Sequence, residues 1–217
     1  MRKVLLFLGL FVSATAIAQS ENSLGESLMN EPLKDPYEAS IAEHREELRQ
    51  EFANPQSSPL DSSDVVGFSD LPYFPIMKSY RVTAQWEAKT DQPVFEMSTT
   101  TSRKPKYRLA GLAHFTINGD SCTLEVYQNM RLLTVPGYED YTFIPFTDYS
   151  NGSESYGGGR YVEAHLPEEG ATEIVIDFNK AYNPYCAYSE RYSCPLVPEA
   201  NYLEVYIPAG VKYEGHH

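Results

Sequence analysis

The polar and apolar positions between residues 36 and 53 repeat with the period of an α-helix. Asp35 suits the N-cap and Pro36 the first turn, while His44 falls on the face expected to be exposed. An apolar stripe of this kind needs a surface to dock on. We therefore predict one amphipathic helix, followed by a Pro- and Ser-rich linker at 54–70. The stripe consists of Tyr37, Ile41, Leu48 and Phe52.

Beyond residue 71 the period changes to two, which is typical of half-buried β-strands. Asn118-Gly119 lies between two of these runs and accepts the positive φ of a tight hairpin turn. Many short strands with few helices predict a mainly β fold over residues 71–213, either an antiparallel β-sandwich or a small barrel. Residues 214–217 are expected to form a loose end. The predicted strands are 82–87, 113–117, 122–127, 141–146, 159–166, 172–178 and 202–207.

The first residues have the pattern of a secretory signal peptide. A short positive segment, Arg2-Lys3, precedes an apolar run and the small residues Ala16-Ile17-Ala18. The apolar run is shorter than the roughly 20 residues needed to span a bilayer. We therefore expect residues 1–18 to be removed, residues 19–35 to form a flexible tail, and the protein to be exported, either periplasmic or secreted.

Composition narrows the class of protein further. The chain has 217 residues, a formal net charge of −13 and 42% hydrophobic residues, which suits one domain with short appendages. Its 17 Tyr and 10 Phe exclude a disordered polymer. The acidic charge argues against nucleic-acid binding, because such proteins present a cationic surface to phosphate.

The densest cluster of aromatic and polar side chains lies in the segment 177–195. It becomes a loop at Asn183-Pro184, since proline disfavours a helical residue before it. Aromatic and amide side chains on a loop over a rigid scaffold are typical of a binding site. The alternative is a structural Ω-loop held by its own tyrosines. The candidate ligand-binding residues of the segment are Asp177, Asn179, Tyr182, Asn183, Tyr185 and Tyr188.

A run of three glycines between Tyr156 and Arg160-Tyr161 forms a second candidate ligand-binding segment. Backbone N–H groups and a guanidinium suit the binding of a carboxylate or a phosphate. We include Asp148 in the same candidate site. The alternative is a flexible turn in which Arg160 pairs with an acid such as Asp148 or Asp177. We favour the turn, because short glycine motifs often match by chance.

Cys186 and Cys194 lie eight positions apart, and in an exported protein this pair predicts a disulfide. The alternative is a reactive thiol at Cys186, which needs a nearby base, and the loop holds no histidine. Two thiolates are too few for a zinc site, so no metal is assigned. Cys122 is expected in the core, and the spacing of His114 and His165 does not require them to meet.

Residues from about 36 to 213 resemble an uncharacterised bacterial family, a domain of unknown function. The resemblance implies an N-terminal helix before a mostly β domain, and it implies no established reaction or ligand. Members of this family often have an acidic residue at the position of Ala200. If that residue is a catalytic base in those members, this chain lacks it. The matching motifs are Thr99-Thr100-Thr101, Val126-Tyr127-Gln128-Asn129, Pro145-Phe146-Thr147-Asp148, Tyr156 through Tyr161, Asp177 through Cys186 and Tyr192-Ser193-Cys194-Pro195.

These observations leave three functions open. We favour the binding of a small polar or anionic ligand by the loop 179–194 with Arg160 and Asp148. The first alternative is a hydrolase that uses Asp177 or Cys186. The second is a structural or interaction module of the cell envelope, with the helix docked on a partner. The sequence assigns no cofactor and no oligomeric state.

Overall fold

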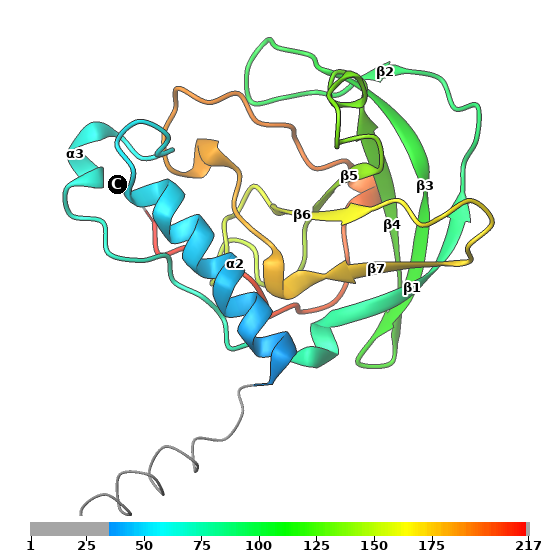
Figure 1. The fold of residues 1–217 in the computed structure, drawn as a ribbon, viewed down its shortest axis with the longest axis horizontal. Coiled ribbons are helices and arrows are strands. Elements are labelled where there is room, and N and C mark those ends of the chain that lie inside the picture. The colour runs from blue at the N-terminus through cyan, green and yellow to red at the C-terminus, as the bar shows by residue number, and fades with distance from the viewer. Residues whose placement is uncertain (1–34, 216–217) are drawn as a thin grey trace, which may run out of the picture. The chain divides into compact units, whose positions relative to one another are not determined.

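The computed structural model describes residues 35–215 (Figure 1). The predicted signal peptide 1–18 and nearly all of the predicted tail 19–35 lie outside the described residues, as do residues 216–217. Within residues 35–215, no helix is long and apolar enough to cross a membrane.

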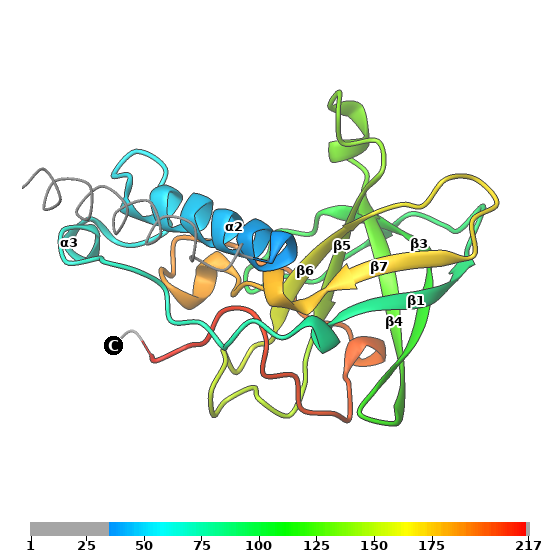
Figure 2. The same cartoon turned by 60° about the horizontal axis from the view of Figure 1, so that its bottom comes forward.

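Seven strands form one antiparallel sheet with the order β6-β5-β4-β3-β1-β7, and β2 pairs with β3. The sheet curls until its two edge strands, β6 and β7, lie side by side (Figures 1 and 2). Of the two predicted architectures, the structure is therefore a small barrel. The strands are β1 (Arg81–Ala88), β2 (Phe95–Glu96), β3 (Lys106–Ile117), β4 (Asp120–Asn129), β5 (Tyr141–Phe146), β6 (Arg160–His165) and β7 (Glu173–Asp177).

The helical elements are few and mostly short. The one long helix is α2, which carries the predicted apolar stripe. The shorter elements are one-turn helices between strands or in the loops. Their bounds are α2 (Pro36–Ala53), α3 (Ser62–Val65), η1 (Lys78–Tyr80), η2 (Leu132–Thr134), η3 (Phe178–Lys180), η4 (Tyr185–Ala187) and η5 (Glu199–Asn201).

The predicted hairpin turn joins β3 and β4. Asn118 and Gly119 have φ values of 53° and 98°, as a tight hairpin requires. β3 is longer than its alternating pattern predicted, and its pairing with β4 shifts at Gly111. A Cβ at Gly111 would lie 2.2 Å from a ring carbon of Trp86, so glycine leaves the room that the indole ring occupies beside the strand.

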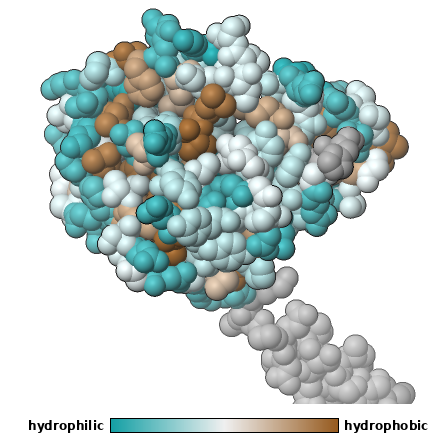
Figure 3. All heavy atoms as spheres, turned by 180° about the vertical axis from the view of Figure 1, so that it is seen from behind, coloured by the Kyte–Doolittle hydropathy of each residue, from teal (hydrophilic) through white to brown (hydrophobic). Residues whose placement is uncertain are grey.

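The two faces of the sheet carry different apolar clusters. Ile144 of β5 and Val162 of β6 belong to the core inside the barrel. Their neighbours Phe143 and Tyr161 point the other way, because side chains alternate along a strand, and join a second cluster on the outer face. On the molecular face in Figure 3, hydrophobic residues are interspersed with hydrophilic ones rather than gathered in one patch.

The helix α2 packs against its own β domain. Ile41 and Phe52 are buried, and the ring of Phe52 meets that of Tyr188 edge-on at 5.0 Å. The segment 54–70 is packed rather than free, since it contains α3 and buries Leu60 beside Phe52. The helix and the segment after it therefore form one apolar cluster with the loop that carries Tyr188.

The predicted strand at 202–207 is wrong. Leu203, Val205 and Ile207 are buried in alternation, as in a strand. However, the segment pairs only briefly with residues 147–149, through bonds such as Leu203 N–H to the Thr147 carbonyl (2.8 Å). After residue 149 the chain that pairs with this segment turns away. The hydrogen bonds between the two therefore do not continue, and the segment remains irregular.

Replacing Phe52 by Ala should lower the free energy of unfolding by about 3–4 kcal/mol, because a well-packed aromatic ring is lost from a shared cluster. Urea denaturation followed by circular dichroism measures the change. Glu47→Ala, on the exposed side of the same helix, is the matched control and should change it by less than about 0.5 kcal/mol. Equal effects of the two substitutions would contradict the docking of α2 on this domain.

Candidate functional site

A cavity of about 440 Å³ lies between α2, the outer face of the sheet and the loop 182–195. We call it the tyrosine pocket. The helix contributes His44, Leu48, Glu51 and Phe52, and the strands contribute Tyr107, Tyr141, Phe143, Tyr161 and Glu163. These strand positions are the outward-facing ones of β3, β5 and β6, which is why they meet the helix rather than the barrel core.

Seven tyrosines line the pocket, and several of their rings contact one another. Tyr161 packs against Phe143 at 4.7 Å between ring centroids and against Tyr182 at 5.8 Å, both edge-on. Tyr185 and Tyr192 meet at 5.2 Å. Mutual packing of this kind holds aromatic rings in one orientation. The seven are Tyr107, Tyr141, Tyr161, Tyr182, Tyr185, Tyr188 and Tyr192.

Two carboxylates order the phenol groups of the pocket. Oε1 of Glu163 accepts hydrogen bonds from the hydroxyls of Tyr141 (2.5 Å) and Tyr182 (2.6 Å). Glu51 on α2 accepts one from Tyr185. Burial, followed by the nearby Glu163 charge, raises the pKa of Tyr141 and of Tyr182, so both phenols remain protonated donors.

His44 adds a neutral imidazole to the pocket wall. Burial, with help from the Lys180 charge, lowers its pKa, whereas a hydrogen bond to the backbone of Lys180 opposes that shift. Nε2 is buried and has no hydrogen-bond partner within residues 35–215. The backbone bond therefore uses Nδ1 as donor, which leaves Nε2 of the neutral ring as an acceptor. The expectation that His44 lies on the exposed face of the helix is wrong.

Asn183 presents a second unpaired acceptor. Its Nδ2 donates to the hydroxyl of Tyr188 and to the carbonyl of Lys212, each at 3.0 Å. Its Oδ1 is buried and without a partner among the described residues. Buried polar atoms are rarely left unpaired, and both of these belong to residues that line the pocket.

The structure brings together half of the sequence-predicted site residues. Tyr161, Tyr182, Asn183, Tyr185 and Tyr188 line the tyrosine pocket. The other five do not line it, and they are Asp148, Tyr156, Arg160, Asp177 and Asn179.

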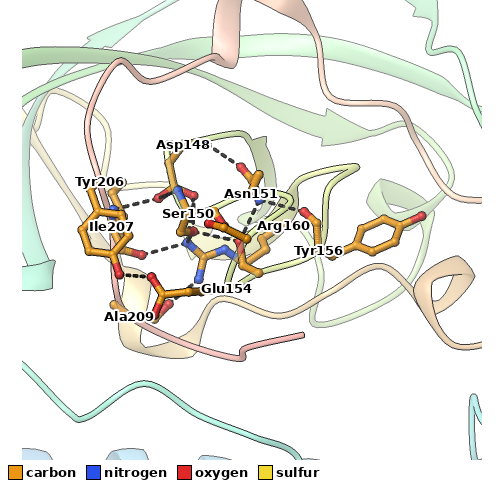
Figure 4. A network of polar contacts seen from close by, with 11 residues as sticks. Asp148, Ser150, Asn151, Glu154, Tyr156, Arg160, Tyr206, Ile207 and Ala209 are labelled. Carbon is orange, nitrogen blue, oxygen red and sulfur yellow. Dashed lines mark hydrogen bonds and ion pairs between the residues drawn. The ribbon is translucent and has the colours of Figure 1, made fainter. Parts of the chain in front are cut away.

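Arg160 and Asp148 form a fully buried ion pair, with 3.0 Å between Nη2 and Oδ1 (Figure 4). The same guanidinium donates to the carbonyls of Ile207 (2.9 Å) and Ala209, and Asp148 accepts from the N–H of Ile207 (2.7 Å). Neither side chain has surface left for an external ligand. The alternative interpretation, a turn in which Arg160 pairs with Asp148, is the arrangement observed.

The glycine run before Arg160 serves packing. Gly159 has a φ of 93°, and a Cβ there would lie 2.5 Å from a methyl carbon of Val197. Tyr156 packs on Tyr213 at 5.1 Å. None of residues 156–160 lines the tyrosine pocket, whereas the next residue, Tyr161, does.

Asp177 and Asn179 tie α2 to the barrel. The hydroxyl of Tyr37 donates to Asp177 Oδ1 at 3.0 Å, and Asn179 Nδ2 donates to the Tyr37 oxygen at 2.9 Å. Asn179 also bonds the N–H and the carbonyl of Met77, each at 2.9 Å. These contacts hold the start of the helix against the end of β7.

The predicted disulfide is not formed in this structure, where Cys186 and Cys194 are neighbouring free thiols. The N–H of Cys186 donates to Sγ of Cys194 at 3.1 Å, and Cys194 lines the pocket. Cys122 is buried in the core. Within residues 35–215, no three His, Cys, Asp or Glu side chains group as a metal site would require.

The sequence interpretation missed Glu51, Glu163, Tyr107 and Tyr141 as residues of the pocket. Tyr161 and Glu163 stand two positions apart on one strand, so their side chains point to the same face. This spacing could have predicted that Glu163 lies beside Tyr161. Glu51 carried no such signal, because helical periodicity alone places it next to the apolar stripe without showing what that stripe faces.

Asp148→Asn keeps the shape of the side chain but leaves the Arg160 charge buried without a counterion. The free energy of unfolding should fall by about 3–5 kcal/mol, measured by chemical denaturation. Glu46→Gln removes an exposed ion pair with Arg49 on α2 and is the matched control, for which little change is expected. A loss as small as that of the control would show that the buried pair is dispensable.

Comparisons with known proteins agree with this fold. Residues 66–212 match a family described as a protein of unknown function, DUF1684. The solution NMR structure of an uncharacterised protein of Haloarcula marismortui is 32% identical with a TM-score of 0.65, and the match covers 83% of this chain and 96% of that one. No curated protein matches the chain. The predicted relation to an uncharacterised family is confirmed, and the chain belongs to the DUF1684 family of proteins of unknown function.

Proposed function

We propose that the protein binds a small molecule in the tyrosine pocket, and that this ligand donates hydrogen bonds from an apolar or aromatic body. The single observation that carries the proposal is the pair of buried, unpaired acceptors, Nε2 of His44 and Oδ1 of Asn183, in residues that line an aromatic cavity. A donor group on a ligand would satisfy atoms that the protein leaves unsatisfied.

The dimensions and walls of the pocket suit such a ligand. A volume of about 440 Å³ falls in the range of small-molecule sites, which combine mostly apolar walls with a few placed polar groups. Tyrosine supplies flat contact area together with a polar tip. Because the rings pack on one another and on Glu163, little ordering is needed when a ligand enters.

The charge of the pocket favours a neutral or cationic ligand over an anionic one. Glu51 and Glu163 line it, His44 is held neutral, and no Lys or Arg of residues 35–215 belongs to its lining. Tyrosine faces also attract organic cations. The polar ligand expected from the sequence therefore fits this pocket, whereas the anionic one depended on Arg160, which is occupied by Asp148.

The other two functions have less support. A hydrolase built on Asp177 or Cys186 has neither residue in the pocket lining. A helix that docks on a partner is not needed to cover its apolar stripe, since Ile41 and Phe52 are already buried in this domain.

Three probes of nearly equal shape test the ligand chemistry: phenethylamine, 2-phenylethanol and phenylacetate. Isothermal titration calorimetry should find the strongest binding for the ammonium, weaker binding for the alcohol and none for the carboxylate. Binding of phenylacetate as tightly as phenethylamine would contradict the proposal.

Glu163→Gln should weaken phenethylamine about threefold to fivefold, as expected for one partly solvated ion pair, and leave 2-phenylethanol unchanged. Glu173→Gln is the matched control, because this exposed carboxylate of β7 does not line the pocket. Equal losses in the two variants would mean that Glu163 is not at the bound cation.

We also propose that the protein is exported, on the support of its N-terminal pattern alone. Mass spectrometry of the mature chain from a periplasmic or culture fraction should find Gln19 as its first residue. Recovery of the chain from the cytoplasmic fraction with residues 1–18 intact would contradict export.

A further inference from the structure

Cys186 and Cys194 stand side by side at the wall of the tyrosine pocket. Cys194 lines the pocket and is otherwise buried, while Cys186 is half-buried behind it. Sγ of Cys194 accepts the backbone N–H of Cys186 at 3.1 Å and a hydrogen bond from the Cys186 thiol. Two thiols in contact can be converted into a disulfide with little movement of the loop.

A clamp of threonines positions Cys194. Its N–H donates to Oγ1 of Thr100 at 3.1 Å, and its carbonyl accepts the N–H of Thr100 at 2.9 Å. Hydroxyl contacts of Ser193 with Thr99 (3.0 Å) and Thr101 (2.6 Å) complete the clamp. Two segments that lie about 94 positions apart in the sequence are thus held together at this thiol.

The surroundings favour the thiolate form of one of the two cysteines. The hydrogen bond from the Cys186 thiol, assisted by the Cys186 N–H and the Arg103 charge, lowers the pKa of Cys194 to about 7. The same hydrogen bond, together with burial, raises the pKa of Cys186. Cys194 is therefore suited to attack, and Cys186 keeps its proton until a later step.

We propose that Cys194 and Cys186 form a redox-active dithiol that reduces small disulfides entering the tyrosine pocket, with Cys194 as the attacking thiolate and Cys186 as the resolving thiol. The proposal goes beyond ligand binding and does not depend on which ligand the pocket prefers.

The reaction balances with a small disulfide RSSR as oxidant. Cys194 thiolate attacks one sulfur of RSSR, the S–S bond breaks, and the first RS⁻ leaves a Cys194–SR mixed disulfide. Cys186 then loses its proton and attacks Sγ of Cys194, which expels the second RS⁻. Two protein thiols are oxidised by two electrons, RSSR is reduced to two RSH, and the two thiol protons pass to the departing thiolates.

The test uses the full chain with Cys122→Ser, so that only the two pocket thiols remain, and hydroxyethyl disulfide as the probe. Peptide mass spectrometry after acid quench should find a Cys186–Cys194 bridge, which 2-mercaptoethanol reopens. With Cys186→Ser added, one mercaptoethanol adduct should accumulate on Cys194. With Cys194→Ser added instead, Cys186 should react at least about tenfold more slowly, because burial still disfavours its thiolate.

Three results would overturn the proposal: thiols that stay unmodified in the parent, a bridge that 2-mercaptoethanol does not open, or faster modification of Cys186 than of Cys194. Circular dichroism and urea midpoints of the two variants confirm that each is folded. Saturating phenethylamine separates this proposal from the binding proposal. The reaction of the protein without phenethylamine tests the dithiol alone. A slower modification of Cys194 when phenethylamine is added tests whether the amine occupies the pocket.

Discussion

The Arg160–Asp148 ion pair is the interaction on which the end of the barrel depends. A guanidinium with no exposed surface needs a counterion and acceptors, because an unpaired buried charge is strongly destabilising. Its Nη2 donates to Asp148 and to the carbonyl of Ile207, and its Nη1 donates to the carbonyl of Ala209, while Nε has no partner within residues 35–215. The irregular segment 203–211 is thereby held across the barrel, where its apolar side chains complete the core.

The same segment then supports the tyrosine pocket. Beyond Ala209 the chain bonds the loop directly, from the N–H of Val211 to the carbonyl of Ala181 at 2.9 Å. The carbonyl of Lys212 accepts from Asn183, and the hydroxyl of Tyr213 donates to the carbonyl of Ala187. The segment that the buried ion pair holds therefore also contacts the loop that lines the pocket, close to the unpaired acceptor of Asn183.

The proposed ligand binding and the proposed thiol chemistry use the same wall of this pocket. Glu163 and the tyrosines line the cavity from the sheet, while Cys194 lines it from the loop. The threonine clamp joins the motif around Thr100 to the motif around Cys194. Because the two motifs are far apart in the sequence, their contact could not be predicted from the sequence. The motifs that stood out along the chain thus divide into a packing group at the barrel end and a pocket group beside α2.

The amino-acid pattern alone predicts the helix 36–53, most strands, the Asn118-Gly119 turn and the mainly β class. Local periodicity, turn conformation and proline are properties of short windows, so they can be read without the fold. The sequence pattern also singled out the loop of Tyr182 and Asn183, two residues that line the tyrosine pocket. Other features of the protein could not be predicted from local sequence. Barrel closure, the burial of Arg160 and the meeting of Glu51 with Tyr185 over 134 positions depend on long-range packing, which no local pattern encodes.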